Sequence, residues 1–200
     1  MRIVITGTAS GVGFELAKKL QHHNVKALTR KELDLSDINA VANYDLGICD
    51  MLINCAATGI GGKIDFVNHR SYNIVAIMNT NLLSPVLLSK QALTNNSNCK
   101  IVNITSTNNN RYYPGDLAYS LSKQSLANFG TMLKIEYPYV RYLEVRLGLT
   151  KTNFNNNRYR HNPERFNDVY TNKHLTVNHV ADRILDVLFD SSIKTIEIAP

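Results

Sequence analysis

Tyrosine, lysine and serine side chains at two points in the chain have the types and the spacing to act together on a carbonyl or an alcohol. Tyr119 and Lys123 are four residues apart at the start of a stretch with helical periodicity, so both side chains lie on one face of the expected helix. Ser106 ends a β-branched run that we expect to be a strand, and a hydroxyl at a strand end can meet the phenol in space. A phenol beside an ammonium group is a suitable general acid, because the positive charge lowers its pKa from the ordinary value of about 10.

A glycine-rich turn, residues 7–13, follows the first expected strand and opens the first expected helix. Its spacing is TGxxxGxG: Gly7 permits a sharp exit from the strand, Gly11 lets the backbone approach a pyrophosphate, and Gly13 allows close packing of the helix. The free N–H groups of the first helical turn then face the anion. The turn predicts a dinucleotide-binding site, and the residues that we expect to contact the dinucleotide there are Gly7, Thr8, Ser10, Gly11, Val12 and Gly13.

The residues after the second expected strand indicate which dinucleotide binds. An acid at this point hydrogen-bonds a ribose 2′-OH, whereas an arginine accommodates a 2′-phosphate. The chain has Arg30 and Lys31 there, and no acid before Glu32. We therefore expect NADP(H) to be preferred, with NAD(H) as the alternative because Glu32 is close by.

Taken together, the TGxxxGxG turn, the YxxxK pair and the upstream serine resemble the short-chain dehydrogenase/reductase family over nearly the whole chain. The resemblance implies a catalytic set made up of Asn81, Ser106, Tyr119 and Lys123. It implies that Tyr119 gives its proton to the carbonyl oxygen, that Ser106 polarises this oxygen, and that Lys123 also binds the nicotinamide ribose. Asn81 would support a water molecule that relays protons near Lys123.

Three further segments resemble the parts of the family that hold the cofactor. Asn54-Cys55-Ala56-Ala57 resembles the family's NNAG segment, from which it departs at two of four positions, and Asp34-Leu35 resembles the acidic residue that contacts the adenine. The stretch 148–152 resembles PGxxxT, with Leu147 in place of the proline. The cofactor-binding residues implied outside the glycine turn and Arg30 are Asp34, Leu35, Asn54, Cys55, Ala56, Tyr119, Lys123, Gly148, Thr150 and Thr152.

The elements that position these residues alternate between strand and helix. Apolar and β-branched runs predict strands at 2–6, 25–28, 51–55, 100–105, 140–147 and 195–199, with at most a very short one at 33–35. Helical spacing predicts helices at 14–21, 72–93, 119–136 and 177–189. The alternation predicts an α/β fold, a doubly wound parallel sheet of the Rossmann type covered on both faces. No linker interrupts it, so we expect a single domain over 1–200.

Two regions are shorter than the family resemblance implies. Between Arg30 and Asp34 there is no room for a helix, so we expect the chain to pass almost directly from the second strand into the third. The segment that should contact the substrate, 153–175, is polar and rich in asparagine, arginine and tyrosine. This composition favours a small substrate with a carboxylate, a phosphate or sugar hydroxyls, and is equally compatible with a solvated lid.

Charge, hydropathy and cysteine usage exclude several classes of protein. Lys and Arg number 22 against 16 Asp and Glu, but the basic residues are scattered and form no motif that binds nucleic acid. The longest apolar run, 82–88, is too short to cross a membrane, and the N-terminus carries no export signal, so we expect a cytoplasmic protein. The 3 cysteines and 6 histidines lack metal-binding spacing, so we expect free thiols and no metal site.

The pattern as a whole predicts an NADP(H)-dependent carbonyl reductase or alcohol dehydrogenase that acts on a small molecule. The alternative is a non-catalytic dinucleotide-binding sensor or scaffold, although such proteins usually lose the tyrosine or the lysine that this chain keeps. An epimerase or a dehydratase on the same fold usually needs a larger C-terminal substrate domain, for which this chain has no room. The helices expected at 72–93 and 119–136 resemble the family's subunit interface, which implies a homodimer or a homotetramer.

Overall fold

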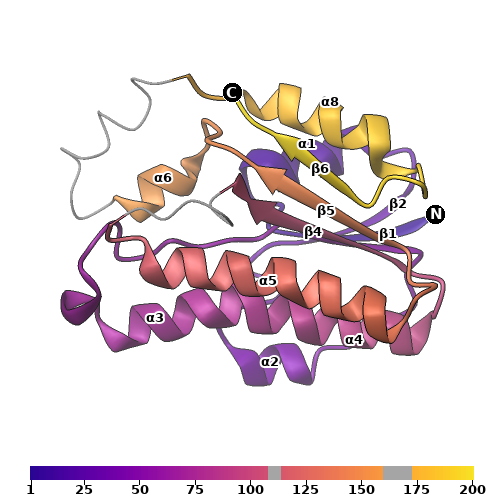
Figure 1. The fold of residues 1–200 in the computed structure, drawn as a ribbon. Coiled ribbons are helices and arrows are strands. Elements are labelled where there is room, and N and C mark those ends of the chain that lie inside the picture. Colours follow the sequence, from indigo (N-terminus) through magenta and orange to yellow (C-terminus); the bar gives the residue numbers. More distant parts are fainter. Residues whose placement is uncertain (108–113, 160–172) are drawn as a thin grey trace.

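One parallel sheet organises the chain in the computed structural model, which describes residues 1–107, 114–159 and 173–200 (Figure 1). Its strand order within these residues is β2-β1-β3-β4-β5-β6, and every neighbouring pair is parallel. The strands are β1 (Arg2–Thr6), β2 (Asn24–Leu28), β3 (Met51–Asn54), β4 (Lys100–Ser106), β5 (Tyr142–Leu147) and β6 (Thr195–Ile198). The order reverses direction between β1 and β3, so the predicted doubly wound fold is confirmed and its ligand-binding crevice is expected at this switch point.

Helices cover both faces of the sheet, as Figure 1 shows. On one face lie α1 (Gly11–Lys19) and α8 (Val177–Leu188), and on the other lie α3 (Ser71–Met78), α4 (Ser84–Asn95) and α5 (Leu117–Glu136). The central strands are apolar at consecutive positions because each side of the sheet meets a helical layer. In β1, for example, Ile3 and Ile5 pack in the cluster under α1 and α8, whereas Val4 packs in the cluster under α4.

The long helix predicted at 72–93 contains an irregular turn. It begins with α3, passes through a π-helical segment, η2 (Asn79–Leu83), and continues as α4. Pro85 has no N–H to donate to the Asn81 carbonyl four residues earlier, and the Ser84 N–H bonds the carbonyl of Asn79, five residues earlier. Such π-turns are frequent at functional sites, and this one carries Asn81.

The segment after β2 differs from the prediction. Residues 33–35 form no strand: the Leu33 N–H donates to the carbonyl of Thr29, and the Asp34 side chain accepts from the Ser36 N–H, so the chain turns here. Leu33 and Leu35 are nevertheless buried, because both pack in the α4-side cluster. A short helix that we did not predict, α2 (Ile38–Ala42), follows this segment and is capped by Asp37.

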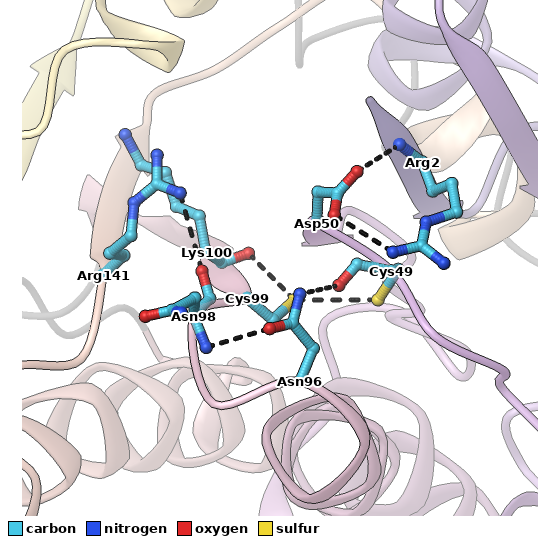
Figure 2. A network of polar contacts seen from close by, with 8 residues as sticks. All are labelled: Arg2, Cys49, Asp50, Asn96, Asn98, Cys99, Lys100 and Arg141. Carbon is cyan, nitrogen blue, oxygen red and sulfur yellow. Dashed lines mark hydrogen bonds and ion pairs between the residues drawn. The ribbon is translucent and has the colours of Figure 1, made fainter.

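The opposite end of the sheet, at the start of the strands, is fixed by a polar network (Figure 2). The Asp50 carboxylate accepts from the Arg2 backbone N–H at 2.7 Å, and the Asn96 side chain donates to the Cys49 carbonyl at 2.9 Å. The Cys49 and Cys99 sulfur atoms lie 3.6 Å apart as buried free thiols, and Cys55 is also free, as expected. Among the described residues, none of the helices is long and apolar enough for a membrane span.

Candidate active site

The candidate residues gather at the carboxyl ends of the parallel strands. Thr6, Asn54 and Ser106 are the last residues of β1, β3 and β4, and α5 begins close by with Tyr119 in its first turn. In Figure 1 the arrowheads of β4 and β5 point toward α6 (Asn153–Arg158). Ligands in doubly wound sheets bind outside these strand ends, so the sheet brings the residues predicted for chemistry to the expected edge.

The Ser106 hydroxyl lies close enough to the Tyr119 phenol to act on its pKa. Tyr119 is half-buried, and burial raises its pKa to about 12, against a smaller lowering effect of the Ser106 hydroxyl. The predicted lowering of this pKa by Lys123 is therefore not what the structure shows: burial raises the pKa, and the opposing effect comes from Ser106. At neutral pH the phenol is protonated and suited to donate a proton.

Lys123 is buried one helical turn after Tyr119. Its ammonium donates to the carbonyl of Ile104 at 2.8 Å, two residues before Ser106 on β4. Burial lowers the pKa of Lys123 to about 8. The structure thus brings Ser106, Tyr119 and Lys123 together through β4 and α5.

Asn81 connects the π-turn to both sides of the site. Its side-chain oxygen accepts from the Thr58 N–H at 2.8 Å, and its amide donates to the Thr58 carbonyl at 2.9 Å and to Ser122 Oγ at 3.0 Å. The Ser122 hydroxyl in turn donates to the Tyr119 carbonyl at 2.7 Å. Asn81 therefore fixes the loop after β3 to the helix that carries Tyr119 and Lys123. Sequence reasoning missed Ser122, whose only signal was a small polar residue on the buried side of a helix.

The glycine turn has the close approaches that its sequence predicts. Gly7 and Gly11 have φ of +75° and +63°, and a Cβ on Gly7 would lie 2.7 Å from Ala56 Cα. A Cβ on Gly13 would lie 2.5 Å from the carbonyl oxygen of Gly7. The turn therefore packs α1 directly against β1 and the loop after β3, at the switch point of the sheet.

The start of α1 suits an anion. Ser10, the N-cap residue, makes no capping hydrogen bond with its side chain, and the first turn holds no acidic residue. Thr8 Oγ1 is buried and has no hydrogen-bond partner among the described residues. Val12 is buried in the first turn and packs in the cluster under α1. Free helical N–H groups and a spare hydroxyl fit the phosphates of a dinucleotide.

Segments on both sides of the turn are held by hydrogen bonds of side chains and by close packing. Thr6 Oγ1 accepts from the N–H groups of Cys55 and Ala56, each at 3.1 Å, so this loop lies against the end of β1. The Asn54 amide instead donates to Asn103 at 2.8 Å inside the protein. A Cβ on Gly11 would lie 3.3 Å from Thr152 Cγ2, so the 148–152 stretch also reaches the turn.

Gly148 and Thr150 hold the 148–152 stretch in place. The Gly148 N–H donates to the Ile198 carbonyl at 2.8 Å, and Thr150 pairs with Leu175 in an isolated bridge. The Thr152 hydroxyl accepts from the Phe154 N–H at 3.2 Å and so caps α6. The end of β5 therefore leads directly into the helix above the site.

Residues at the end of β2 form the outer part of the site. Arg30 is exposed, and the Glu32 carboxylate accepts from the Thr29 N–H at 2.9 Å. Burial raises the pKa of Asp34, but hydrogen bonds from Ser36 outweigh this effect and the pKa is lowered overall. The Leu35 side chain is buried, and its carbonyl accepts from the Ser84 hydroxyl at 2.7 Å. Arg30 and Asp34 thus lie near the crevice, whereas the Leu35 side chain belongs to the core.

A buried ion pair that sequence reasoning missed closes the other side of the site. Arg158, on α6, pairs with Asp116, the residue before α5. The Arg158 guanidinium carbon lies 5.2 Å from the centre of the Tyr119 ring. Arg160 and His161, from the same polar stretch, lie outside the described residues.

Comparison with known proteins settles the family. Residues 25–163 match the sequence model of the short chain dehydrogenase family. The chain belongs to this family. As a short-chain dehydrogenase it is an NAD(P)-dependent oxidoreductase, and the predicted enzyme class is confirmed.

Individual relatives of this short-chain dehydrogenase come from two different organisms. An NADP-dependent 3-hydroxy acid dehydrogenase of Schizosaccharomyces pombe is 25% identical over 93% of this chain and 86% of its own length. A probable short-chain type dehydrogenase/reductase of Helicobacter pylori is 28% identical over 98% of this chain and 80% of its own length. The chain therefore spans most of the length of both relatives.

Solved structures confirm the fold of this short-chain dehydrogenase. A serine dehydrogenase complexed with NADP+ superimposes with a TM-score of 0.83 at 20% identity, over 99% of this chain and 94% of the other. A 4-hydroxyisoleucine dehydrogenase complexed with NADH and succinate gives a TM-score of 0.80 at 21% identity, over 100% of this chain and 97% of the other. The missing strand at 33–35 does not change the architecture.

Proposed function

We propose that this short-chain dehydrogenase uses NADP(H) to reduce a carbonyl group, or to oxidise the corresponding alcohol, on a small polar substrate. The observation that carries the proposal is the closeness of the Ser106 hydroxyl to the Tyr119 phenol, next to the buried Lys123. This closeness supports a protonated phenol and a second hydroxyl that both bond one substrate oxygen. The protein then needs to supply only orientation and a proton.

The proposed roles follow from the contacts of each residue. Tyr119 donates its proton to the carbonyl oxygen, and Ser106 holds this oxygen in place. Lys123 keeps its ammonium at the end of β4, through the Ile104 carbonyl, where positive charge opposes the effect of burial on the phenol. A bound nicotinamide dinucleotide supplies the hydride. Asn81 and Ser122 position α5 relative to the loop after β3.

The preference for NADP(H) rests on the end of β2. Arg30 is exposed there, and the Glu32 carboxylate is bonded to Thr29. An exposed guanidinium can bind a 2′-phosphate with two parallel hydrogen bonds. Solved structures of the same fold are complexed with NADP+ and with NADH. Because of Arg30, we propose NADP(H) as the preferred cofactor and NAD(H) as the weaker one.

The substrate segment is proposed to be residues 153–175, within a single domain of 1–200. Its described part places α6 over the strand ends next to Tyr119. The names of relatives that act on a 3-hydroxy acid, on serine and on 4-hydroxyisoleucine support a small polar substrate.

A homodimer or a homotetramer is proposed from exposed apolar side chains on α3, η2 and α5. These side chains are Tyr72, Val75, Leu83, Leu117, Leu121, Met132 and Ile135. Large exposed apolar surface on a folded protein marks an interaction surface. Light scattering on the eluting protein tests this proposal: a double change of Met132→Glu and Ile135→Glu should yield monomers, and Val67→Glu, on an exposed residue elsewhere, should not.

Titration of nicotinamide fluorescence tests the cofactor proposal without a substrate. We expect NADPH to bind more tightly than NADH, and Arg30→Ala to weaken NADPH binding by about tenfold with little effect on NADH. Equal affinity for both cofactors in the wild type would contradict the role of Arg30. Binding of neither cofactor would favour a scaffold function.

A further inference from the structure

Arg158 is a buried cation beside the proposed proton donor. Only 8% of its side chain is exposed, and the rings of Tyr119, Phe154 and Tyr159 lie 5.2, 5.9 and 5.6 Å from its guanidinium carbon. These rings replace water around the charge. A guanidinium without its hydration shell requires an anionic partner.

Asp116 provides an anion, but the pair leaves hydrogen-bonding capacity unused. Arg158 Nη2 contacts the Asp116 carboxylate, whereas the buried Nε of Arg158 has no hydrogen-bond partner among the described residues. Asp116 occupies the N-cap position of α5, yet its side chain makes no capping bond. Aspartate at this position normally accepts from helical N–H groups. The Asp116 carboxylate can therefore cap α5 when Arg158 binds a different anion.

We propose that Arg158 binds a carboxylate group of the substrate, which takes the place of Asp116 in the ion pair. This inference rests on the proposed function and names the substrate class of the same site, small oxo acids and their hydroxy acids. The carbonyl of such a molecule would meet Tyr119 and Ser106 while its carboxylate meets Arg158.

The charge balance selects a carboxylate over a phosphate. Asp116 carries one negative charge against one positive charge on Arg158, and both side chains are at least nine-tenths buried. A substrate carboxylate has the charge and the planar pair of oxygens of the group it replaces, so Arg158 keeps one anionic partner. The displaced Asp116 carboxylate then accepts from the free N–H groups at the start of α5, where it is the N-cap residue. A phosphate dianion would bring an excess negative charge into the same enclosed space.

Two glycines in the loop after β3 hold Arg158 in position. A Cβ on Gly59 would lie 3.2 Å from Arg158 Cδ and 3.0 Å from the Phe154 ring, and a Cβ on Gly62 would lie 3.0 Å from the Arg158 carbonyl. The loop that Asn81 fixes at Thr58 therefore also supports the guanidinium. Asn81 thus holds both the loop that packs against Arg158 and, through Ser122, the helix that carries Tyr119.

Calorimetric binding of a matched pair of molecules, in the presence of NADP+, tests the inference. The probes are 3-hydroxybutanoate and its uncharged amide, 3-hydroxybutanamide. We expect the wild type to bind the acid at least about tenfold more tightly than the amide, and Arg158→Gln to remove this preference while it still binds the amide. Equal binding of acid and amide by the wild type, or an unchanged preference in Arg158→Gln, would overturn the inference.

The partner residue separates recognition from a structural role. Asp116→Asn removes the competing anion, so it should tighten binding of the acid several-fold and leave the amide unaffected; weaker binding of both molecules would show that the pair is structural. Because Arg158→Gln leaves Asp116 without a cation, the double variant with Asp116→Asn is measured beside it, with circular dichroism as the check on folding. Selective binding of the acid without NADP+ reduction would refute the proposed function and leave this inference standing.

Discussion

Asn81 Nδ2 donates a hydrogen bond to Ser122 Oγ across 3.0 Å, from the π-turn of one long helix to the helix that carries Tyr119 and Lys123. Asn81 is fully buried, and its remaining polar contacts are with the backbone of Thr58. One amide side chain therefore fixes the distance between three segments of the candidate site. The family resemblance assigned no role to Ser122, so the contact between Asn81 and Ser122 is a useful first test.

Ser122→Ala should destabilise the protein and reduce activity. The change leaves an N–H of Asn81 without a buried partner and removes the Ser122 bond to the Tyr119 carbonyl, at a cost of about 1–3 kcal/mol in the free energy of unfolding. Ser120→Ala is the matched control, because Ser120 is also buried in α5 but its hydroxyl has no hydrogen-bond partner among the described residues. Urea denaturation measures both. Equal losses of stability in the two variants would show that the Asn81 contact contributes little.

Gly13→Ala should weaken cofactor binding. Its Cβ would lie 2.5 Å from the Gly7 carbonyl oxygen, and backbone on both sides must move to relieve the contact. We expect a loss of about 1–3 kcal/mol in stability together with weakened NADPH binding. Gly47→Ala is the control: Gly47 has a φ of +71° and no atom within 4 Å of its Cβ position, so the change strains the backbone far from the turn. An NADPH affinity in Gly13→Ala equal to that of the wild type would place the dinucleotide elsewhere.

Lys100→Met should change how stability depends on pH. Lys100 is buried, and its ammonium donates to the carbonyls of Leu188 and Asp190 at 2.7 and 3.1 Å. Burial lowers its pKa from 10.5 to about 8, so between these values the unfolded chain binds a proton that the folded chain does not. Raising the pH from 8 to 10 should therefore stabilise the wild type relative to Lys100→Met, by on the order of 1–3 kcal/mol.

Urea denaturation of both proteins at several pH values measures this difference. Comparison with Lys100→Met cancels the contributions of the thiols and phenols that titrate in the same range. Lys90→Met, at an exposed lysine of α4, is the control and should show no such slope. A stability difference that is constant with pH would mean that Lys100 keeps its ordinary pKa in the folded protein.

The sheet and the glycine turn could be predicted because their signals are local. The central strands are apolar at consecutive positions, and the residues of the turn are adjacent in the chain. A very short strand was allowed at 33–35, and none forms there. Two leucines two residues apart fit a strand as well as a turn whose side chains both enter the core. The five residues of α2 are too few for a helical period, and only Val41 among them is buried.

The candidate site could be predicted where each role requires a particular residue type at a particular spacing, as for Ser106, Tyr119 and Lys123. The residues that were missed act through contacts between distant parts of the chain. Asp116 and Arg158, whose pairing was missed, are separated by all of α5, by β5 and by most of α6, and neither belongs to a motif. The pKa of Tyr119 was predicted to fall because the sequence shows a nearby lysine but not the depth of burial, which raises it to about 12.

The most direct test of the proposed reaction is the turnover of Tyr119→Phe compared with its affinity for NADPH. We expect oxidation of NADPH with a small oxo acid to fall on the order of 100- to 10,000-fold, while the dissociation constant of NADPH stays close to that of the wild type, because the phenol hydroxyl supplies the proton and the glycine turn supplies the binding. Turnover within a few-fold of the wild type, with the same NADPH affinity, would contradict the assignment of Tyr119 as the proton donor.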